Sequence, residues 1–340
     1  MAIGILILGP MSDKYGRKPI LIASISLSFI FSAACAFAPN ITLLILARAA
    51  SAFGAGGMVA IGTALIKDSF TGKEMSKVLS LTQAFMLLAP MLAPLVGALI
   101  LKVADWKMTF IALALLTGIS LVGAFLLQET LPVSERTQSN TIQSILGLRK
   151  IAKKPNFMSL LLVGAFISAP YMAYLALASY IYIDGFGVSE TTFSMYFAIN
   201  SAAAILGPIM YMRFGAGSVK KVINVGIVVA IISAVLILTV GNISPIIFLL
   251  SYVIYSIVTS YFRPLISDLL LSATKTDVGA ASSVMNFVFT VLGSVGMIVG
   301  SLAWSSYISG LAITMLIFIA ITILVWFYIL KAKSIKFDWK

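Results

Sequence analysis

The chain has no histidine, one cysteine and few charged residues, and each shortage excludes a class of function. Only 10% of its 340 residues are charged, whereas a water-facing surface needs about a quarter. Without histidine, the chain lacks the usual metal ligand and the usual proton shuttle near neutral pH. Cys35 alone can form neither an internal disulfide nor a thiolate cluster. We therefore expect no metal site and no bound cofactor.

The residues that are present are mostly apolar: 61% are hydrophobic, and the mean hydropathy is +1.09. A membrane-crossing helix needs about twenty mainly apolar residues. Ten runs meet this length, at 19–38, 41–66, 78–101, 108–127, 157–183, 192–212, 219–240, 243–271, 278–304 and 310–330. The sequence therefore predicts an all-α membrane protein.

The basic residues are distributed unevenly between the two predicted sides of the membrane. Of 23 lysines and arginines, nineteen lie on one side, Lys102 and Lys107 on the other, and Arg48 and Arg263 within spans. By the positive-inside rule the richer side, with the C-terminus, is cytoplasmic. We expect a bacterial cytoplasmic (inner) membrane protein. The net charge of +12 is spread over short loops, which argues against binding of nucleic acid.

The longest polar segment, 128–156, predicts a cytoplasmic linker. It separates an N-terminal helical half (1–127) from a C-terminal six-helix half (157–331), with a cytoplasmic tail at 332–340. Short features recur between the halves, since Gly9-Pro10 returns as Gly207-Pro208 and Asp68 is matched by Asp268. Repeats of this kind are typical of secondary transporters. No span contains a carboxylate pair and no phosphate-binding loop is present, so neither an enzyme nor a nucleotide-driven pump is expected.

Residues 9–19 predict a cationic tight loop between two apolar helices. Gly16 permits a turn that would not accept a Cβ atom. Asp13 can face the N-terminus of a neighbouring helix, and Arg17 can pair with a carboxylate such as Asp68. The alternative interpretation is a plain basic loop that only sets membrane orientation.

Arg48 lies seven residues into its span, where a bare cation costs about 2.5–3.5 kcal/mol or more. No Asp or Glu lies in the interior of a predicted span. The partner is then a backbone carbonyl, Gln83, lipid or water reached by snorkelling, or a residue outside this chain. Arg263, just before Pro264, is either an anchor at the cytoplasmic surface, which we favour, or a second buried cation.

Two further groups of residues suggest transport. The span 78–101 contains two prolines, which kink a helix, and small residues that allow close packing; these are Pro90, Ala93, Pro94 and Gly97. Polar side chains deep in apolar helices need a partner or a water-filled cavity. The candidates to line such a substrate cavity are Gln83, Tyr171, Tyr174, Asn200 and Asn286.

Five motifs in order along the chain resemble those of one family. They are residues 9–18, Arg48 with Gly54, residues 89–97, residues 128–132, and residues 186–189 with 197–200. Together they resemble the major facilitator superfamily, and within it the drug:proton antiporter-1 type of the bicyclomycin and chloramphenicol resistance (Bcr/CflA) subfamily. Ala93 and Ala98 stand where the antiporter motif prefers glycine, which weakens that part of the resemblance.

The resemblance implies two six-helix halves, no cofactor beyond a proton gradient, and alternating access that couples protons to efflux of small amphipathic drugs. It implies a conformational latch on the cytoplasmic side, with residues Gly9, Asp13, Gly16, Arg17, Lys18 and Asp68. Arg48 would take part in coupling. The partners expected are the lipid bilayer, a drug-like small molecule and protons, and we expect a monomer.

Residues 1–11 are too short to cross a membrane, so we expect the first helix and half of the second to be missing. About ten and a half membrane helices would then remain. The resemblance places a proton-binding acid on that absent helix, as the lost counterpart of Arg48. Alternatives are uptake or exchange of a small metabolite on the same fold, or a truncated, non-transporting membrane subunit.

Overall fold

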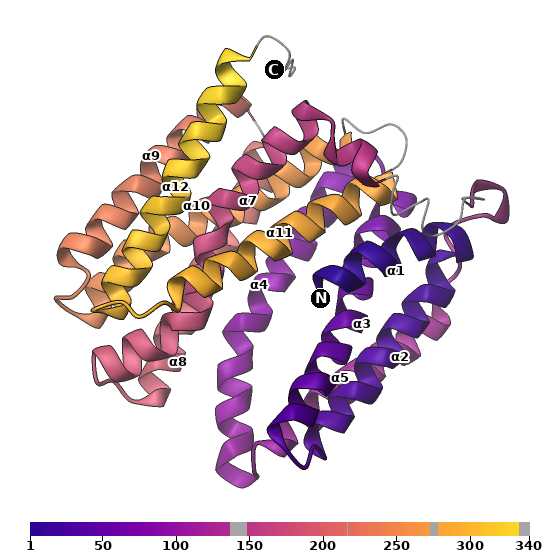
Figure 1. The fold of residues 1–340 in the computed structure, drawn as a ribbon, viewed down its shortest axis with the longest axis horizontal. Helices are drawn as coiled ribbons and strands as arrows, with labels where there is room; N and C mark the ends of the chain where they lie inside the picture. The colour runs from indigo at the N-terminus through magenta and orange to yellow at the C-terminus, as the bar shows by residue number, and fades with distance from the viewer. Residues whose placement is uncertain (137–147, 216, 273–277, 333–340) are drawn as a thin grey trace. The chain divides into compact units, whose positions relative to one another are not determined.

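A computed structural model describes residues 1–136, 148–215, 217–272 and 278–332, and the regular elements in these ranges are all helices (Figure 1). The long helices are α1 (Ala2–Tyr15), α2 (Arg17–Ala36), α3 (Ile41–Ser69), α4 (Gly72–Val103), α5 (Lys107–Leu126), α7 (Pro155–Ser179), α8 (Glu190–Phe214), α9 (Val219–Val240), α10 (Pro245–Ser272), α11 (Val278–Gly300) and α12 (Tyr307–Lys331). A short 3₁₀ turn, η1 (Val133–Glu135), follows α5. A π-helical turn, η2 (Tyr180–Gly185), extends α7.

The prediction of an all-α membrane protein is confirmed. In the described ranges, nine helices are long and apolar enough to cross a membrane. The one predicted span that is not among these nine, 78–101, lies in the 32-residue helix α4. A helix of twenty residues rises about 30 Å, which matches the thickness of the hydrocarbon core. Side chains cap the N-termini of α3, α8 and α10. Asn40 accepts from the Leu43 N–H at 2.9 Å, Ser189 from the Thr192 N–H at 3.2 Å, and Ser244 from the Ile247 N–H at 3.2 Å.

The predicted loop at residues 9–19 is wrong in its extent. Helix α1 continues through Pro10 to Tyr15, and α2 begins at Arg17, so Gly16 alone separates the two helices. Gly16 has φ +105°, a backbone conformation that strongly favours glycine. Pro19 is tolerated because it lies in the first turn of α2, where a backbone N–H has no helical acceptor.

The chain folds into two compact units. The first unit contains Met1–Met75, Val96–Lys153 and Leu271–Thr290; the second contains Ser76–Leu95, Lys154–Leu270 and Val291–Lys340. Helices α4 and α11 therefore contribute to both units. The boundaries placed at 127 and 157 from the sequence stay a prediction.

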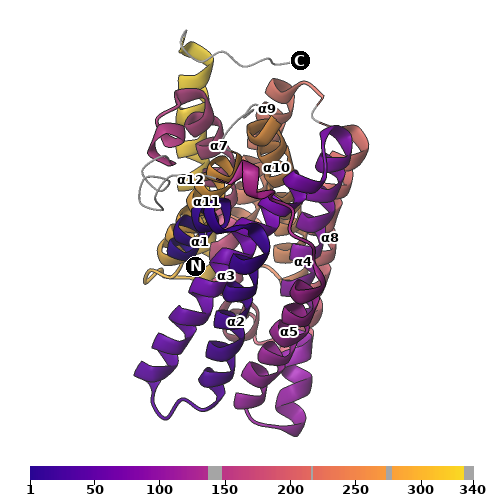
Figure 2. The same ribbon diagram turned by 90° about the vertical axis from the view of Figure 1, so that its right-hand side faces the viewer.

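In the first unit, α2 packs against α3 and α5, and α1 packs against α3 and α2. Figure 2 shows α2, α3 and α5 side by side, as does Figure 1. The helices approach closely because small residues meet: a Cβ atom at Gly54 would lie 2.5 Å from the Ser24 carbonyl oxygen. Ser32 and Ser51 pair across the same interface at 2.9 Å. Apolar residues such as Leu8, Ile25 and Ile61 fill the core.

In the second unit, α12 packs against α7 and α9. Helices α8 and α10 are joined by hydrogen bonds, including Ser260 Oγ to the Ala204 carbonyl at 2.6 Å. Tyr174 of α7 stacks on Tyr252 of α10, with ring centroids 4.0 Å apart. Both rings are fully buried, so aromatic packing forms much of this unit's core.

Candidate functional site

A charged network surrounds Arg17, the first residue of α2. Its Nε donates to Asp68 Oδ2 of α3 at 2.8 Å, and its Nη1 donates to Ser12 Oγ at 2.8 Å. The same Nη1 forms an ion pair with Asp13 of α1. The Arg17 side chain is only 5% exposed, while those of Asp13 and Asp68 are about one-fifth exposed. One buried guanidinium therefore joins the ends of three helices.

Glu129, just after α5, completes the network from the other side. Its Oε1 accepts the Arg17 N–H at 2.9 Å and the Leu131 N–H at 3.0 Å, and its Oε2 accepts the Lys18 N–H at 3.2 Å. Arg136 pairs with Oε2 at 3.6 Å. The first backbone donors of a helix have no partner within it. Glu129 thus caps the N-terminus of α2 from a distant part of the chain.

The environment of Glu129 favours its ionised form. Burial by itself would raise the pKa of the carboxyl group, but the N–H donors of Leu131, Arg17 and Lys18, together with the charge of Arg136, lower that pKa below its ordinary value. The positive end of the α2 dipole acts in the same direction. Glu129 is therefore a fixed anion at neutral pH.

The pairing of Arg17 with Asp68 expected from the sequence is confirmed. Asp13 forms an ion pair with Arg17, and Glu129 caps the N-terminus of α2. The expected position of Asp13 at the N-terminus of a neighbouring helix stays a prediction. Sequence analysis marked residues 128–132 as part of a motif but assigned Glu129 no role. The available signal was an acid placed directly after a long apolar span.

The glycines and the lysine of this region also have defined contacts. A Cβ atom at Gly16 would lie 2.4 Å from Glu129 Oε2, so the cap requires glycine there. At Gly9, a Cβ atom would lie 2.3 Å from Ser283 Oγ of α11. Lys18 Nζ donates to the Phe125 carbonyl at 2.8 Å, near the C-terminal end of α5.

Arg48 lies on an exposed face of α3, with its guanidinium 5.6 Å from the centroid of the Phe110 ring of α5. A cation over an aromatic face gains about 0.5–1 kcal/mol at an exposed site. Phe110 was not among the partners considered from the sequence. It could have been found, because both residues lie within one to two turns of the same predicted side of the membrane.

The packing expected of the span 78–101 is partly wrong. Ala93 is exposed, and a Cβ atom at Gly97 would meet nothing within 4 Å among the described residues. The side chains of Pro90 and Pro94 lie outside the described residues. Close packing through glycine occurs instead in α11, where a Cβ atom at Gly296 would lie 2.4 Å from the Ala169 carbonyl oxygen.

The cavity candidates are divided between the two units. Tyr174 and Asn200 are fully buried inside the second unit, so neither lines an accessible surface in this structure. Asn286 belongs to the first unit, where its Nδ2 donates to Thr63 Oγ1 of α3 at 3.4 Å. Tyr171 is half-buried in α7, and the Gln83 side chain lies outside the described residues. The expectation that amides in the spans find partners holds for Asn286.

Comparison with known proteins assigns the fold to a family. The sequence profile of the Major Facilitator Superfamily matches residues 1–297, most of the chain. The chain belongs to the major facilitator superfamily. It is 33% identical to the uncharacterized MFS-type transporter YdgK of Bacillus subtilis, over 87% of this chain and 75% of YdgK.

Other relatives carry names that refer to drug resistance. The chain is 29% identical to the chloramphenicol resistance protein CraA of Acinetobacter baumannii, over 56% of this chain and 46% of CraA. It is 24% identical to the multidrug resistance protein MdtM of Escherichia coli O157:H7, over 88% of this chain and 74% of MdtM. The chain thus spans about half to three-quarters of the relatives named here.

Among solved structures, the human organic anion transporter MFSD10 superposes with a TM-score of 0.77. The two are 17% identical, and the match covers 96% of this chain and 80% of MFSD10. This likeness shows the major facilitator fold.

Major facilitator proteins contain two halves related by a repeat, and the second unit has a counterpart to the Arg17 network. Tyr211 of α8 donates its hydroxyl to Asp268 Oδ2 of α10 at 2.5 Å, and Tyr261 donates to the Gly215 carbonyl at 2.6 Å. The recurring positions predicted from the sequence, Asp68 and Asp268, thus both accept hydrogen bonds from a neighbouring helix. The donor to Asp268 from α8 is a neutral hydroxyl, whereas the donor to Asp68 from α2 is a guanidinium.

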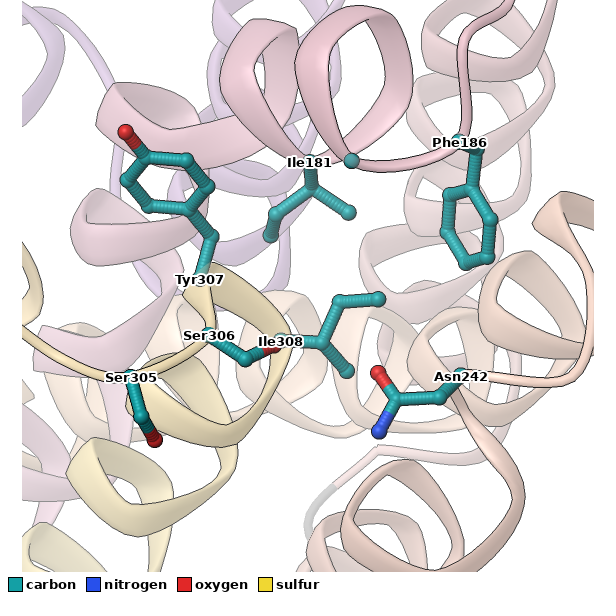
Figure 3. Close-up of a pocket in the computed structure, with 8 residues that line it drawn as sticks. Ile181, Phe186, Asn242, Ser305, Ser306, Tyr307 and Ile308 are labelled. Atoms are coloured by element: carbon teal, nitrogen blue, oxygen red, sulfur yellow. The ribbon is translucent and has the colours of Figure 1, made fainter.

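A pocket of about 400 Å³ opens at the end of the second unit where α7 passes into η2. Figure 3 shows Ile181, Phe186 and Ile308 around it, with the Asn242 amide at its edge. Ser305 and Ser306 of the α11–α12 connection, Tyr307 at the start of α12, and Gly185 complete the wall. The lining is neutral, and the pocket lies near the start of α10, away from Asp268.

Proposed function

We propose that this protein belongs to a proton-coupled efflux system that exports small amphipathic compounds by alternating access. The observation that carries the proposal is the alignment with relatives named for multidrug and chloramphenicol resistance. The resemblance of residues 89–97 to the antiporter motif supports proton coupling and the assignment to the bicyclomycin and chloramphenicol resistance subfamily. The excess of basic residues on one side supports an inner-membrane location with a cytoplasmic C-terminus.

In this mechanism, the Arg17 network acts as the cytoplasmic latch. Its buried ion pairs hold α1, α2 and α3 in one arrangement, and removal of a partner would leave a buried charge. Arg48 takes part in coupling, because its cation lies within a span, close to Phe110, where a charge is costly unless a partner offsets it. Tyr171 is the described residue that we retain as a contact for the transported compound.

The test is drug resistance in an efflux-deficient bacterial host. The chain, and a form extended upstream in its gene, would be expressed and assayed against a drug panel with and without a protonophore. We expect drug resistance that the protonophore abolishes. The Arg48→Ala variant should lose this resistance. The control variant Arg213→Ala, which removes an exposed charge beside Phe214, should retain it.

Resistance that persists in the Arg48→Ala variant would remove Arg48 from the mechanism. If neither form confers resistance, the efflux assignment is wrong. Drug accumulation in cells separates export from uptake, because a collapsed proton gradient raises accumulation only when the protein exports.

A further inference from the structure

The pocket beside η2 is not used by the proposed mechanism. It lies where three connections meet: η2, which follows α7, the turn from α9 to α10, and the connection from α11 to α12. All three connections belong to the second unit, so the pocket is complete within one compact unit. Its volume of about 400 Å³ is within the range of small-molecule sites, roughly 300–1,000 Å³. The pocket is therefore large enough for a small organic compound.

A rare backbone turn forms one wall of this pocket. In the π-helical turn η2, the Phe186 N–H donates to the Ile181 carbonyl at 3.1 Å. Such turns are often found at functional sites. Gly185 lies in this wall, and its φ is not positive. A Cβ atom there would meet only the Tyr180 carbonyl oxygen among the described residues, at an ordinary 3.5 Å. Packing therefore does not require glycine at 185, and its missing side chain leaves space in the pocket.

The pocket has an apolar centre and a polar edge. Ile181 and Ile308 are buried, and Figure 3 shows their side chains pointing toward one another, with the Phe186 ring beside them. At the edge, Asn242 is exposed, and the Ser306 hydroxyl makes no capping hydrogen bond to α12. An amide and a hydroxyl can both donate and accept hydrogen bonds. The lining therefore fits a compound with an apolar body and a polar head group.

The charges around the pocket favour an uncharged head group. The segments 180–190, 241–244 and 301–306 contain no lysine or arginine, whereas Asp184 and Glu190 are exposed there. An anion would lose hydration without meeting a cation, which costs energy. A cation would gain little, because an ion pair with an exposed carboxylate is weak.

Two exposed tyrosines lie next to the pocket. The ring of Tyr180, which precedes Ile181, lies 5.5 Å from the ring of Tyr307 in the pocket wall. Exposed tyrosines of this kind are typical of the level at which a membrane meets water. A compound that is apolar at one end and polar at the other is favoured at the same level.

We propose that this pocket binds an uncharged amphipathic compound of the aromatic amide class. The apolar body lies against Ile181, Ile308 and Phe186, and the head group lies at Asn242. The side-chain amide of Asn242 both donates and accepts, so it can form two hydrogen bonds with a primary amide. Binding in this pocket requires no transport, so it is separate from the proposed function.

Equilibrium dialysis with the purified full chain in lipid nanodiscs tests the binding, with uptake by empty nanodiscs subtracted. The probes are 2-naphthamide and its anionic analogue 2-naphthoate. We expect naphthamide to bind about tenfold more tightly, a difference of about 1.4 kcal/mol. Asn242→Ala should weaken naphthamide binding about fivefold. The control Gln128→Ala, which removes an exposed amide from the first unit, should leave it unchanged.

Asn242→Asp keeps the shape of the side chain at an exposed position, so it tests the site without a change in packing. The new carboxylate should weaken naphthamide binding and strengthen binding of 2-naphthylmethylammonium about threefold, or about 0.65 kcal/mol. Gln128→Glu introduces the same charge in the first unit and should change neither affinity. Gly185→Leu should fill the pocket and weaken naphthamide binding at least tenfold.

Hydrogen exchange locates the bound probe, because naphthamide should slow exchange in the peptide 180–188 and leave α5 unchanged. No saturable binding of naphthamide, or equal binding of naphthoate, would overturn the proposal. Affinities that stay the same in both Asn242 variants would also overturn it. Drug resistance without naphthamide binding would remove this pocket and leave the efflux assignment. Naphthamide binding without drug resistance would do the reverse.

Discussion

Replacing Glu129 by glutamine tests whether a single carboxylate holds the start of α2. The amide keeps one acceptor oxygen and loses the second, together with the negative charge. Of the present contacts, two N–H donors reach Oε1, and the Lys18 N–H and Arg136 reach Oε2. At least one backbone donor therefore loses its acceptor.

The expected loss follows from these contacts. Loss of an N-terminal cap costs about 0.5–2 kcal/mol, and loss of a charge at the helix dipole costs about 0.3–1 kcal/mol. The ion pair with Arg136 adds little, because both side chains are about one-quarter exposed. We expect Glu129→Gln to lower the free energy of unfolding by about 1–2 kcal/mol.

The assay is SDS-induced unfolding of the full chain in mixed micelles, which measures the free energy of unfolding. Glu135→Gln is the matched control, since Glu135 is exposed in η1 only a few residues away. We expect that variant to unfold like the parent.

The pH dependence gives a second, independent check. A carboxyl group whose pKa is lowered in the folded state stabilises the protein above its unfolded pKa, and this stabilisation is lost as the pH falls through the folded value. The ordinary pKa of a glutamate is 4.5. The gap between parent and Glu129→Gln should therefore be full at neutral pH and shrink on acidification below about pH 4.5. Equal stability of the two glutamine variants, or a gap that widens in acid, would refute the argument.

Two further predictions use the same unfolding measurement. Gly296→Ala should destabilise the chain by about 1–3 kcal/mol, because the new Cβ would press on the backbone oxygen of Ala169. Its control, Gly97→Ala, should be neutral or stabilising by up to about 1 kcal/mol. If Gly97→Ala destabilised the chain more than Gly296→Ala, the packing described for α11 would be contradicted. Tyr211→Phe should cost about 1.5–3 kcal/mol, because the Asp268 carboxylate loses a hydroxyl donor, and an unchanged free energy of unfolding would show that the 2.5 Å contact contributes nothing.

The corrections share a physical cause. A glycine–proline pair such as Gly9-Pro10 predicts a helix break only when the residues around it do not continue the helix. Pro10 lies inside α1, because the helix continues on both sides of it and ends only at Gly16. Small residues predict close packing only where a partner helix approaches. Gly296 has such a partner and Gly97 has none within 4 Å among the described residues, although their local sequences allow both outcomes.

The sequence by itself determined the membrane class and the approximate positions of the membrane-spanning helices, and it offered Asp68 as one possible partner of Arg17. Helix positions depend on local hydrophobicity and length, which a single span displays in full. Tertiary structure alone decided that Glu129 caps α2 and that Phe110 lies under Arg48. These contacts join residues that are far apart in the chain. The sequence of one span shows which side chains it contains, but it does not show which neighbouring helix those side chains contact.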